Sequence, residues 1–304
     1  MTLNPSFWAG RRVLVTGHTG FKGSWLGLWL NSLKCELTCL GLEPENLSTS
    51  GKSFFDCIGL ASTLGSRHFV GDIRDYHFVQ RVVEASDPSV VIHLAAQSLV
   101  RRSYQDPIGT WEANVLGSLN LIEALRGIGS PCAVVMVTTD KVYCNREWDF
   151  GYREADRLGG KDPYSASKAA AEIAISSWRD SFCGTAPHQT PFLHLATARA
   201  GNVIGGGDWA ADRIIPDAVR ALSAGVPIPI RNPMATRPWQ HVLEPLGGYL
   251  LLAEKLHGQA SCFGRLETHG YTFASAFNFG PYSEANRPVV ELIEAALQLS
   301  LIHI

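Results

Sequence analysis

A glycine-rich turn between a strand and a helix constrains the fold of this chain more than any other feature. The segment 13–15 is a short, mostly β-branched apolar run, and the apolar stretch 25–33 has helical spacing. Glycine lets the chain turn tightly between them while its backbone approaches a pyrophosphate, whose charge the helix N-terminus stabilises. An ordinary turn can hold the same glycines, but the position between strand and helix favours a dinucleotide site. Cofactor contacts are predicted at Gly17, Thr19, Gly20, Phe21 and Gly23.

Strands and helices alternate along the first 200 residues. Buried-type strands are expected at 37–42, 68–70, 89–93, 133–138 and 193–198, and helices at 76–85, 114–125 and 165–178. This alternation predicts βαβ units, and strands that are apolar on both faces predict a parallel sheet covered on both sides. We therefore expect an α/β fold with a Rossmann-type doubly wound parallel sheet over 1–200, to which parts of 238–280 return. A smaller substrate lobe is expected over 201–304, with loops at 205–207 and 227–238.

The composition limits the kinds of partner and the cellular compartment that we expect for this chain. Hydrophobic residues make up 46% of the 304, enough for a sizeable core, and the net charge of −2 suggests neither a nucleic-acid nor a membrane partner. No apolar run approaches the length of a membrane span, and residues 1–9 do not resemble a signal peptide. Seven cysteines without a Cys-x-x-Cys pair are typical of free thiols in a reducing compartment. We expect a cytoplasmic protein without a metal site.

Further cofactor contacts are predicted where the next strands end. Glu43 follows the second strand, where a carboxylate accepts hydrogen bonds from the adenosine ribose and repels a 2′-phosphate. This favours NAD over NADP, although Glu43 could instead be a solvated loop residue. Asp72 and Ile73 would lie under the adenine, but Asp72 could equally be a turn-forming aspartate. The remaining predicted contacts are Ala95, Ala96 and Gln97 after the fourth strand, and Asn114 in the next helix.

Tyr164 and Lys168 are four residues apart at the start of an expected helix, so they share one face and both would also touch the cofactor. The ordinary pKa of a phenol is about 10. A nearby lysine and the positive nicotinamide ring would favour the phenolate, which makes Tyr164 a usable base. The strand before this helix ends in Thr139-Asp140-Lys141, at an edge where α/β sites occur. A solvated charge pair is the alternative for Asp140 and Lys141.

Several motifs together resemble the extended short-chain dehydrogenase/reductase family, in its NAD-dependent epimerase and dehydratase group. They are the glycine turn, Gly71-Asp-Ile-Arg-Asp75, His93-x-Ala-Ala-Gln97 and Tyr164-x-x-x-Lys168. Thr139-Asp140-Lys141 and the segments 145–148, 199–209 and 237–245 are similar to those of the sugar-nucleotide 4,6-dehydratases that use CDP-glucose. Members that use dTDP-glucose usually have Thr-Asp-Glu instead of Thr-Asp-Lys. The resemblance runs from about Trp8 to about Ile293.

The resemblance implies redox-neutral dehydration of CDP-D-glucose to CDP-4-keto-6-deoxy-D-glucose, with NAD as a catalytic cofactor. Tyr164, helped by Lys168, would remove the O4 proton while Thr139 binds the same oxygen. Asp140 would protonate the departing C6 hydroxyl, and Lys141 would take the C5 proton. The arginines would hold phosphates, with surface solvation as the alternative. The implied sugar-nucleotide contacts are Gln97, Asn202, Arg213, Arg231, Arg237 and Asn278.

Other functions stay open. The chain could be a non-catalytic NAD-binding protein, or an epimerase or dehydratase of another sugar nucleotide. Family members usually continue for several dozen residues beyond the helix expected near Glu284, so the substrate lobe is expected to be C-terminally truncated. We also expect a homo-oligomer, a dimer or a tetramer, assembled through the apolar faces of the helices around 112–126 and 165–179.

Overall fold

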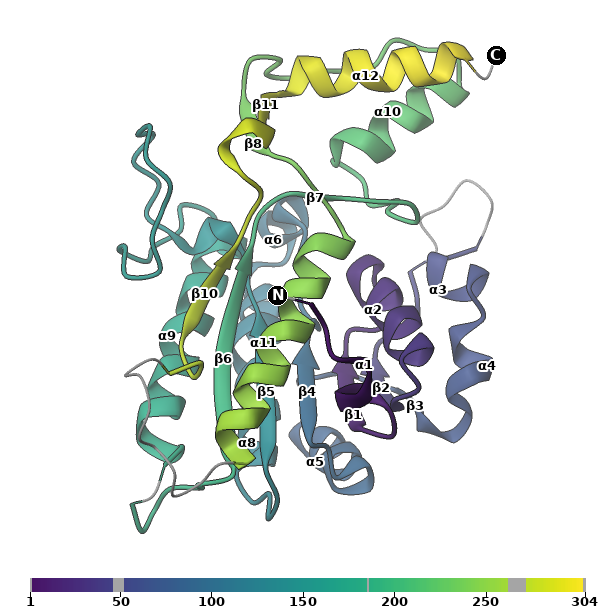
Figure 1. Ribbon diagram of the computed structural model, residues 1–304. Coiled ribbons are helices and arrows are strands. Elements are labelled where there is room, and N and C mark those ends of the chain that lie inside the picture. The colour runs from purple at the N-terminus through teal and green to yellow at the C-terminus, as the bar shows by residue number, and fades with distance from the viewer. Residues whose placement is uncertain (1, 46–51, 185, 262–271, 303–304) are drawn as a thin grey trace.

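A seven-stranded parallel sheet forms the centre of the protein, which the computed structural model describes over residues 2–45, 52–184, 186–261 and 272–302 (Figure 1). Its strands are β1 Arg12–Thr16, β2 Glu36–Gly41, β3 His68–Val70, β4 Val90–His93, β5 Cys132–Val137, β6 Leu193–Ala200 and β10 Ala276–Phe279. They lie in the order β10-β6-β5-β4-β1-β2-β3, and all neighbours are parallel. The strand order reverses between β1 and β4, so the predicted doubly wound sheet is confirmed.

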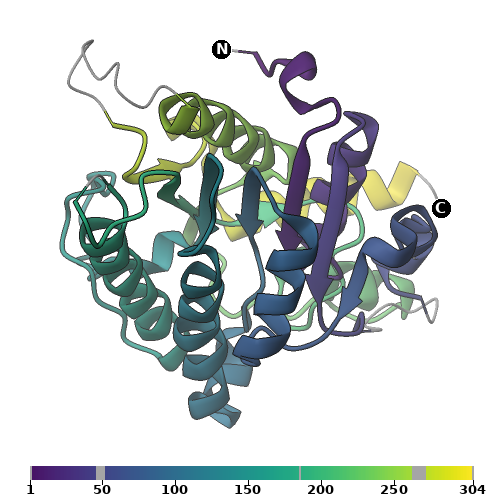
Figure 2. The same cartoon turned by 90° about the horizontal axis from the view of Figure 1, so that it is seen from below.

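Helices cover both faces of this sheet (Figures 1 and 2). Helices α2 (Phe21–Ser32) and α11 (Leu243–Ser261) lie on one face. The opposite face carries α5 (Tyr76–Ser86), α8 (Gly117–Leu125) and α9 (Pro163–Phe182). The shorter helical segments are α1 Pro5–Trp8, α3 Phe54–Cys57, α4 Leu60–Leu64, η1 Gly65–Arg67, α6 Val100–Gln105, α7 Pro107–Trp111, the π-helical η2 Glu112–Leu116, η3 Asp140–Val142 and η4 Ser283–Ala285.

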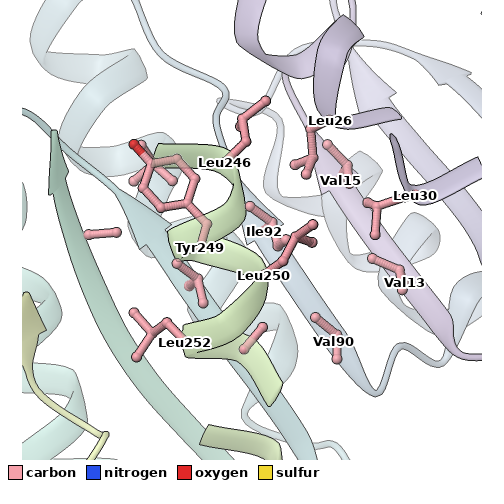
Figure 3. Packing of buried hydrophobic residues seen from close by; sticks show 14 of the residues in the cluster. Val13, Val15, Leu26, Leu30, Val90, Ile92, Leu246, Tyr249, Leu250 and Leu252 are labelled. Carbon is pink, nitrogen blue, oxygen red and sulfur yellow. The ribbon is translucent and has the colours of Figure 1, made fainter. Parts of the chain in front are cut away.

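The strands β1, β2, β4, β5 and β6 divide their apolar side chains between two buried clusters, one under each helical layer. Along β1, Val13 and Val15 belong to the cluster beneath α2 and α11, whereas Leu14 belongs to the other. Successive side chains of a strand point to opposite faces, so a strand covered on both faces must be apolar throughout. Each such buried side chain contributes about 1.5–3 kcal/mol. Figure 3 shows the first cluster, which also contains Leu26, Leu30, Val90, Ile92, Leu246 and Leu250.

The observed elements confirm every strand and helix expected within the first 200 residues, with shifted ends. Helix α2 begins at Phe21 rather than near Trp25, because the chain becomes helical directly after its N-cap Gly20. Asn114 lies in the π-helical segment η2 rather than in a regular helix. The long helix α11 was not predicted, although it supplies much of the cover over β5 and β6.

A group of elements at the top of Figure 1 stands apart from the sheet. It consists of α10 (Ile214–Ser223), α12 (Val289–Ile302) and the antiparallel pair β8 (Thr236–Pro238) and β11 (Asn286–Pro288). A parallel pair, β7 (Val203–Ile204) and β9 (Gln240–His241), lies where the chain passes between this group and the sheet. Among the described residues, no helix has the length and apolar character needed to cross a membrane.

Candidate active site

The turn between β1 and α2 can only be made by glycine at two of its positions. Gly17 has φ +75°, and a Cβ there would lie 2.6 Å from the backbone nitrogen of Ala95. A Cβ on Gly23 would overlap the carbonyl oxygen of Gly17. A Cβ on Gly20, by contrast, would have its nearest neighbour at 3.5 Å, and no described side chain caps the helix here. The first N–H groups of α2 therefore remain open to a ligand.

The residues predicted near the adenosine lie at the carboxyl edge of the sheet, as the turn does. Thr19 ties the turn to the end of β2, because its hydroxyl donates to the Leu42 carbonyl at 2.9 Å. Glu43 follows directly and is exposed. Asp72 accepts hydrogen bonds from the backbone and side chain of Arg74, which holds the pKa of its carboxyl below the usual value. Ile73 is buried against α8. Asp72 thus makes the backbone contact of a turn-forming aspartate, which is the alternative interpretation given for it above.

Gln97 and Asn114 form a network that fixes the loop after β4. The Gln97 amide donates to the Leu99 carbonyl and the Thr110 hydroxyl, and its oxygen accepts from the Leu99 backbone. The buried Asn114 amide binds both backbone polar groups of Gln97 and donates to the Ser167 hydroxyl at 2.9 Å. These contacts attach the loop to α9. Ala95 and Ala96 precede Gln97 in this loop and are half-buried, and the backbone of Ala95 packs against Gly17.

A capping box fixes the start of α9 and with it the position of Tyr164. The Asp162 carboxylate accepts from the Ser165 backbone N–H at 3.0 Å, and the Asp162 N–H donates to the Ser165 hydroxyl at 3.2 Å. Tyr164 therefore lies in the first turn and Lys168 in the second, both buried. The Lys168 amine donates to the Val137 carbonyl at 3.3 Å, and burial lowers its pKa to about 8.

The Tyr164 phenol lies among the predicted catalytic residues. Burial raises the pKa of Tyr164, while the charge of Lys141, a hydrogen bond with Thr139 and the charge of Arg213 lower it. The negative charge of Asp140 opposes them. Because burial dominates, Tyr164 needs a further positive charge beside it to act as a base near neutral pH.

The segment that follows β5 brings three predicted catalytic residues into contact with one another, namely Thr139, Asp140 and Lys141. The Thr139 hydroxyl donates to the Asp140 carboxylate at 3.0 Å and accepts from the Lys141 backbone N–H at 3.3 Å. The Lys141 ammonium lies 3.4 Å from the same carboxylate oxygen and 3.4 Å from the side-chain oxygen of Asn202. Thr139 is buried, whereas the other two side chains are partly exposed. One acid, one amine and one phenol are thus held together at the carboxyl edge.

A buried ion pair, which was not predicted from the sequence, lies next to the end of β5. Glu172 and Arg199 lie 2.9 Å apart, and their side chains are 2% and 4% exposed. The Glu172 carboxylate also accepts from Thr138 at 2.5 Å and from Thr197 at 2.8 Å. The pair therefore connects α9 to β5 and β6. Two signals could have shown it: Glu172 follows Lys168 by four residues, and an arginine interrupts an apolar strand.

Lys22 and Tyr249 are a second group that was missed. The half-buried Lys22 amine lies 3.4 Å from the Tyr249 hydroxyl, which Figure 3 shows pointing away from the aliphatic cluster. Burial first, then the charges of Arg213, Lys168 and Lys141, lower the pKa of Lys22 to about 7, while Asp140 raises it. Lys22 therefore lies close enough to the predicted catalytic residues for their charges to act on it. A lysine directly inside the glycine motif was the available signal.

The predicted sugar-nucleotide residues do not all gather at this cluster. The positive charge of Arg213 lowers the pKa of the Tyr164 phenol, and its guanidinium lies 2.7 Å from the Asp208 carboxylate. Arg231 pairs with Asp212, which also binds Arg101, so it belongs to a separate exposed group. The other two residues make contacts elsewhere: Arg237 donates to the Thr236 carbonyl, and Asn278 accepts from the Tyr143 hydroxyl at 2.6 Å.

Comparison with known proteins agrees with this geometry. Residues 14–278 match the family described as GDP-mannose 4,6 dehydratase. The CDP-glucose 4,6-dehydratase of Salmonella typhimurium is 43% identical over 98% of this chain and 78% of its own length. The CDP-paratose 2-epimerase of Salmonella typhi is 34% identical over 53% of this chain and 51% of its own length.

Solved structures share the fold. The dTDP-glucose 4,6-dehydratase of Streptomyces venezuelae, with NAD and TYD bound, superposes with a TM-score of 0.70 at 24% identity, over 94% of this chain and 81% of that one. The UDP-glucose 4-epimerase of Thermus thermophilus, in complex with NAD, also gives 0.70 at 24% identity, over 95% and 83%. The resemblance seen in the sequence motifs is confirmed, and the chain belongs to the GDP-mannose 4,6 dehydratase family of sugar-nucleotide enzymes.

Proposed function

We propose that this protein dehydrates CDP-D-glucose to CDP-4-keto-6-deoxy-D-glucose, with NAD as a catalytic cofactor. The observation that carries the proposal is the convergence of Thr139, Asp140 and Lys141 on the Tyr164 phenol. The reaction needs one base for oxidation and an acid and a base for elimination, and this cluster contains a candidate for each. The cytidine nucleotide is supported by the relative that is 43% identical over nearly the whole chain.

The residues around the β1–α2 turn fit a dinucleotide. Gly17 and Gly23 pack against backbone with no room for a side chain, while Gly20 leaves its outer side open above the N-terminus of α2. These features suit a pyrophosphate, and the exposed Glu43 suits the ribose hydroxyls of NAD. Held by these residues, NAD would supply a temporary acceptor for the hydride of sugar C4, which is returned to C6.

Oxidation requires Tyr164 to take the proton of the O4 hydroxyl. Lys141, Thr139 and Arg213 already oppose the effect of burial on the pKa of Tyr164. The positive nicotinamide ring would add to them, which stabilises the phenolate. The capping box at Asp162 and the anchored amine of Lys168 keep the first two turns of α9 in place during this step.

Elimination then divides between the two residues that follow Thr139. The C4 ketone makes the C5 proton acidic, and the amine of Lys141 removes it. Asp140 gives a proton to the departing C6 hydroxyl, which leaves as water. The two side chains are partly exposed and so can reach a sugar above the strand end. Lys141 afterwards returns its proton to C5.

We assign the nucleotide to the group of elements above the sheet, α10, β8, β11 and α12. Arg213 at the N-terminus of α10 is close enough to the cluster to act on Tyr164, so it suits the phosphate nearest the sugar. Arg231 and Arg237 are proposed for the outer phosphate, and Gln97, Asn202 and Asn278 for the remaining polar contacts. Arginine's fixed fork suits these phosphates better than lysine.

A direct assay tests the proposal. Purified protein with NAD is mixed separately with CDP-, dTDP-, UDP- and GDP-linked sugars, and products are identified by mass spectrometry. The expected product is the 4-keto-6-deoxy sugar from CDP-glucose, with NAD favoured over NADP. Thermal stabilisation by NAD without turnover of any sugar would indicate the non-catalytic alternative, and a C4-epimerised product would indicate an epimerase.

The protein is proposed to assemble as a homodimer through α7–α8 and α9. Ile108, Trp111, Leu116 and Ile173 are between 40% and 69% exposed on these helices. Large apolar side chains gathered on neighbouring helices commonly mark a protein interface. Light scattering of the purified protein measures the oligomeric state directly.

A cytoplasmic location is also proposed. All six cysteines among the described residues are free thiols, and burial raises the pKa of the Cys39 and Cys132 thiols, which keeps them protonated and unreactive. Free thiols of this kind suit a reducing compartment. Fractionation of cells that produce the protein tests this assignment.

A further inference from the structure

Three consecutive glycines, Gly205-Gly206-Gly207, lead directly to an ion pair that contains Arg213, a residue proposed for the substrate. The carboxylate of Asp208, whose side chain is 7% exposed, lies 2.7 Å from the Arg213 guanidinium and accepts from the Ala210 backbone N–H at 3.2 Å. Glycine loses more conformational freedom on folding than any other residue. The glycine segment therefore needs support from neighbouring elements if the ion pair is to keep its place.

Trp25, in the second turn of α2, holds the middle glycine of this segment. Its indole N–H donates to the Gly206 carbonyl at 2.8 Å. Its ring also lies edge-on to the ring of His241, with 6.5 Å between the two centroids. His241 belongs to β9, which pairs with β7, the strand directly before the glycines. Trp25 therefore contacts both the glycine segment and the strand pair that leads into it.

The outer two glycines rest against aromatic rings of α2 and α3. Gly207 has φ +85°, and a Cβ there would overlap the Phe54 ring of α3. A Cβ on Gly205 would lie 3.2 Å from the ring of Phe21, the first residue of α2. The Phe54 ring in turn packs against the Trp25 ring, with 5.1 Å between their centroids. Helices α2 and α3 thus support all three glycines.

We propose, on the basis of the function proposed above, that Trp25 is a positioning residue for the sugar nucleotide. By holding Gly206, it keeps the Asp208–Arg213 pair where the Arg213 guanidinium can bind the diphosphate. A site that is ordered before its ligand arrives loses little conformational entropy on binding, whereas a free glycine segment would have to be ordered by the nucleotide itself. The helix whose N-terminus is assigned to the cofactor therefore also determines the geometry of the substrate site.

Trp25→Phe tests this assignment, because phenylalanine keeps a ring against Phe54 but has no N–H for the Gly206 carbonyl. Calorimetric titration measures the affinity of the NAD-loaded protein for CDP, with UDP, dTDP and GDP in parallel. We expect Trp25→Phe to weaken nucleotide binding about two- to tenfold, the effect of one hydrogen bond, while NAD affinity stays unchanged. Trp29→Phe is the matched control on the same helix, since Trp29 packs against Gly247 of α11, and its nucleotide affinity should not change.

A double-mutant cycle with Arg213→Ala distinguishes positioning from a general structural effect. Arg213→Ala should itself weaken nucleotide binding, and in that background Trp25→Phe should have little further effect. Phe54→Leu removes the ring from beneath Gly207 and should behave in the same way, so it decides the matter if Trp25→Phe does not fold. Equal effects of Trp25→Phe with and without Arg213, unchanged affinity in Trp25→Phe, or a parallel loss of NAD affinity would each overturn the proposal.

The same titrations separate this proposal from the proposed function. Binding of another nucleoside diphosphate in place of CDP would contradict the proposed substrate, while the cycle carried out with that nucleotide would still test the role of Trp25. If the unmodified protein binds none of the four nucleotides, both proposals fail.

Discussion

Asp140 is the residue at which oxidation and elimination can be separated. Its carboxylate is bound by Thr139 and Lys141 and has no direct bond to the Tyr164 hydroxyl among the described contacts. We expect Asp140→Asn to oxidise C4 but to lose about a hundred- to ten-thousand-fold in turnover, because an amide cannot supply the proton. Quenched-flow mass spectrometry should show the oxidised sugar accumulating. Absence of any oxidised sugar would show that Asp140 acts before elimination, and Asp87→Asn, an exposed acid on the far edge, is the control.

His93 makes the stability of the fold depend on pH. Burial, and then the charge of Lys168, lower the pKa of His93 from 6.5 to about 3. Between these values the unfolded chain binds more protons than the folded one, so stability is lost as the pH falls from about 6.5 towards 3. Each pH unit in that window costs up to about 1.4 kcal/mol. Urea unfolding at several pH values should show a shallower slope for His93→Asn, and equal slopes would contradict this.

At the residue scale, the sequence placed the proposed catalytic side chains at one edge of the sheet but did not show which residues they contact. The order of residues placed Thr139, Asp140 and Tyr164 at the carboxyl edge, because strand ends and helix starts can be read from periodicity. It could not show that the Lys168 amine binds a strand carbonyl or that Glu172 pairs with Arg199. Those contacts join segments far apart in the chain, and only the packed fold determines their distances.

The β1–α2 turn offers two glycine substitutions with opposite outcomes. Gly23→Ala would force a methyl group against the Gly17 carbonyl, so we expect it to destabilise folding by about 1–3 kcal/mol or more. Gly20→Ala meets no close neighbour and replaces only an N-cap glycine, so its cost should stay below about 1 kcal/mol. Its effect should appear in NAD affinity instead. Thermal unfolding and calorimetric titration separate the two, and equal stability of both variants would contradict this account.

The Glu172–Arg199 pair connects three elements, and its loss should destabilise the fold. Glu172→Gln leaves the Arg199 charge buried without its counter-ion, and breaking such a pair typically costs about 3–5 kcal/mol. The same acid-to-amide change in the exposed Arg12–Asp87 pair, Asp87→Asn, should cost at most about 1 kcal/mol. Chemical denaturation measures both values. A similar decrease in the free energy of unfolding in the two variants would mean that burial of the Glu172–Arg199 pair has no energetic consequence.

At the element scale, helix α11 shows where reading a sequence fails. Its segment contains Pro245 and the pair Gly247-Gly248, residues that usually end helices. In the structure these glycines allow close packing instead, since a Cβ on Gly247 would contact the Trp29 ring at 3.3 Å and one on Gly248 would overlap the Phe279 ring. The side chains that pack against these two glycines come from α2 and β10, which are distant from α11 in the sequence. Local propensity alone therefore does not predict this helix.

At the scale of the whole molecule, the exposed apolar side chains on α7, η2 and α9 predict that a charge placed among them will disrupt the proposed dimer. Ile173 is 61% exposed on α9, and we expect Ile173→Glu to shift the protein from dimer to monomer without loss of folding. Val226→Glu, at a 53% exposed position beyond α10, is the matched control and should leave the dimer intact. Sedimentation velocity measures both. An unchanged dimer in Ile173→Glu would place the interface elsewhere.

The path of the chain limits how the two parts of the molecule can move. After β6 the chain leaves the sheet for α10, comes back through β9 into α11 and β10, and leaves again for β11 and α12. Three backbone connections thus join the upper elements to the sheet. These connections restrict the upper elements to small rotations relative to the sheet. No single proteolytic cut between the described elements can therefore release the upper elements together as one piece.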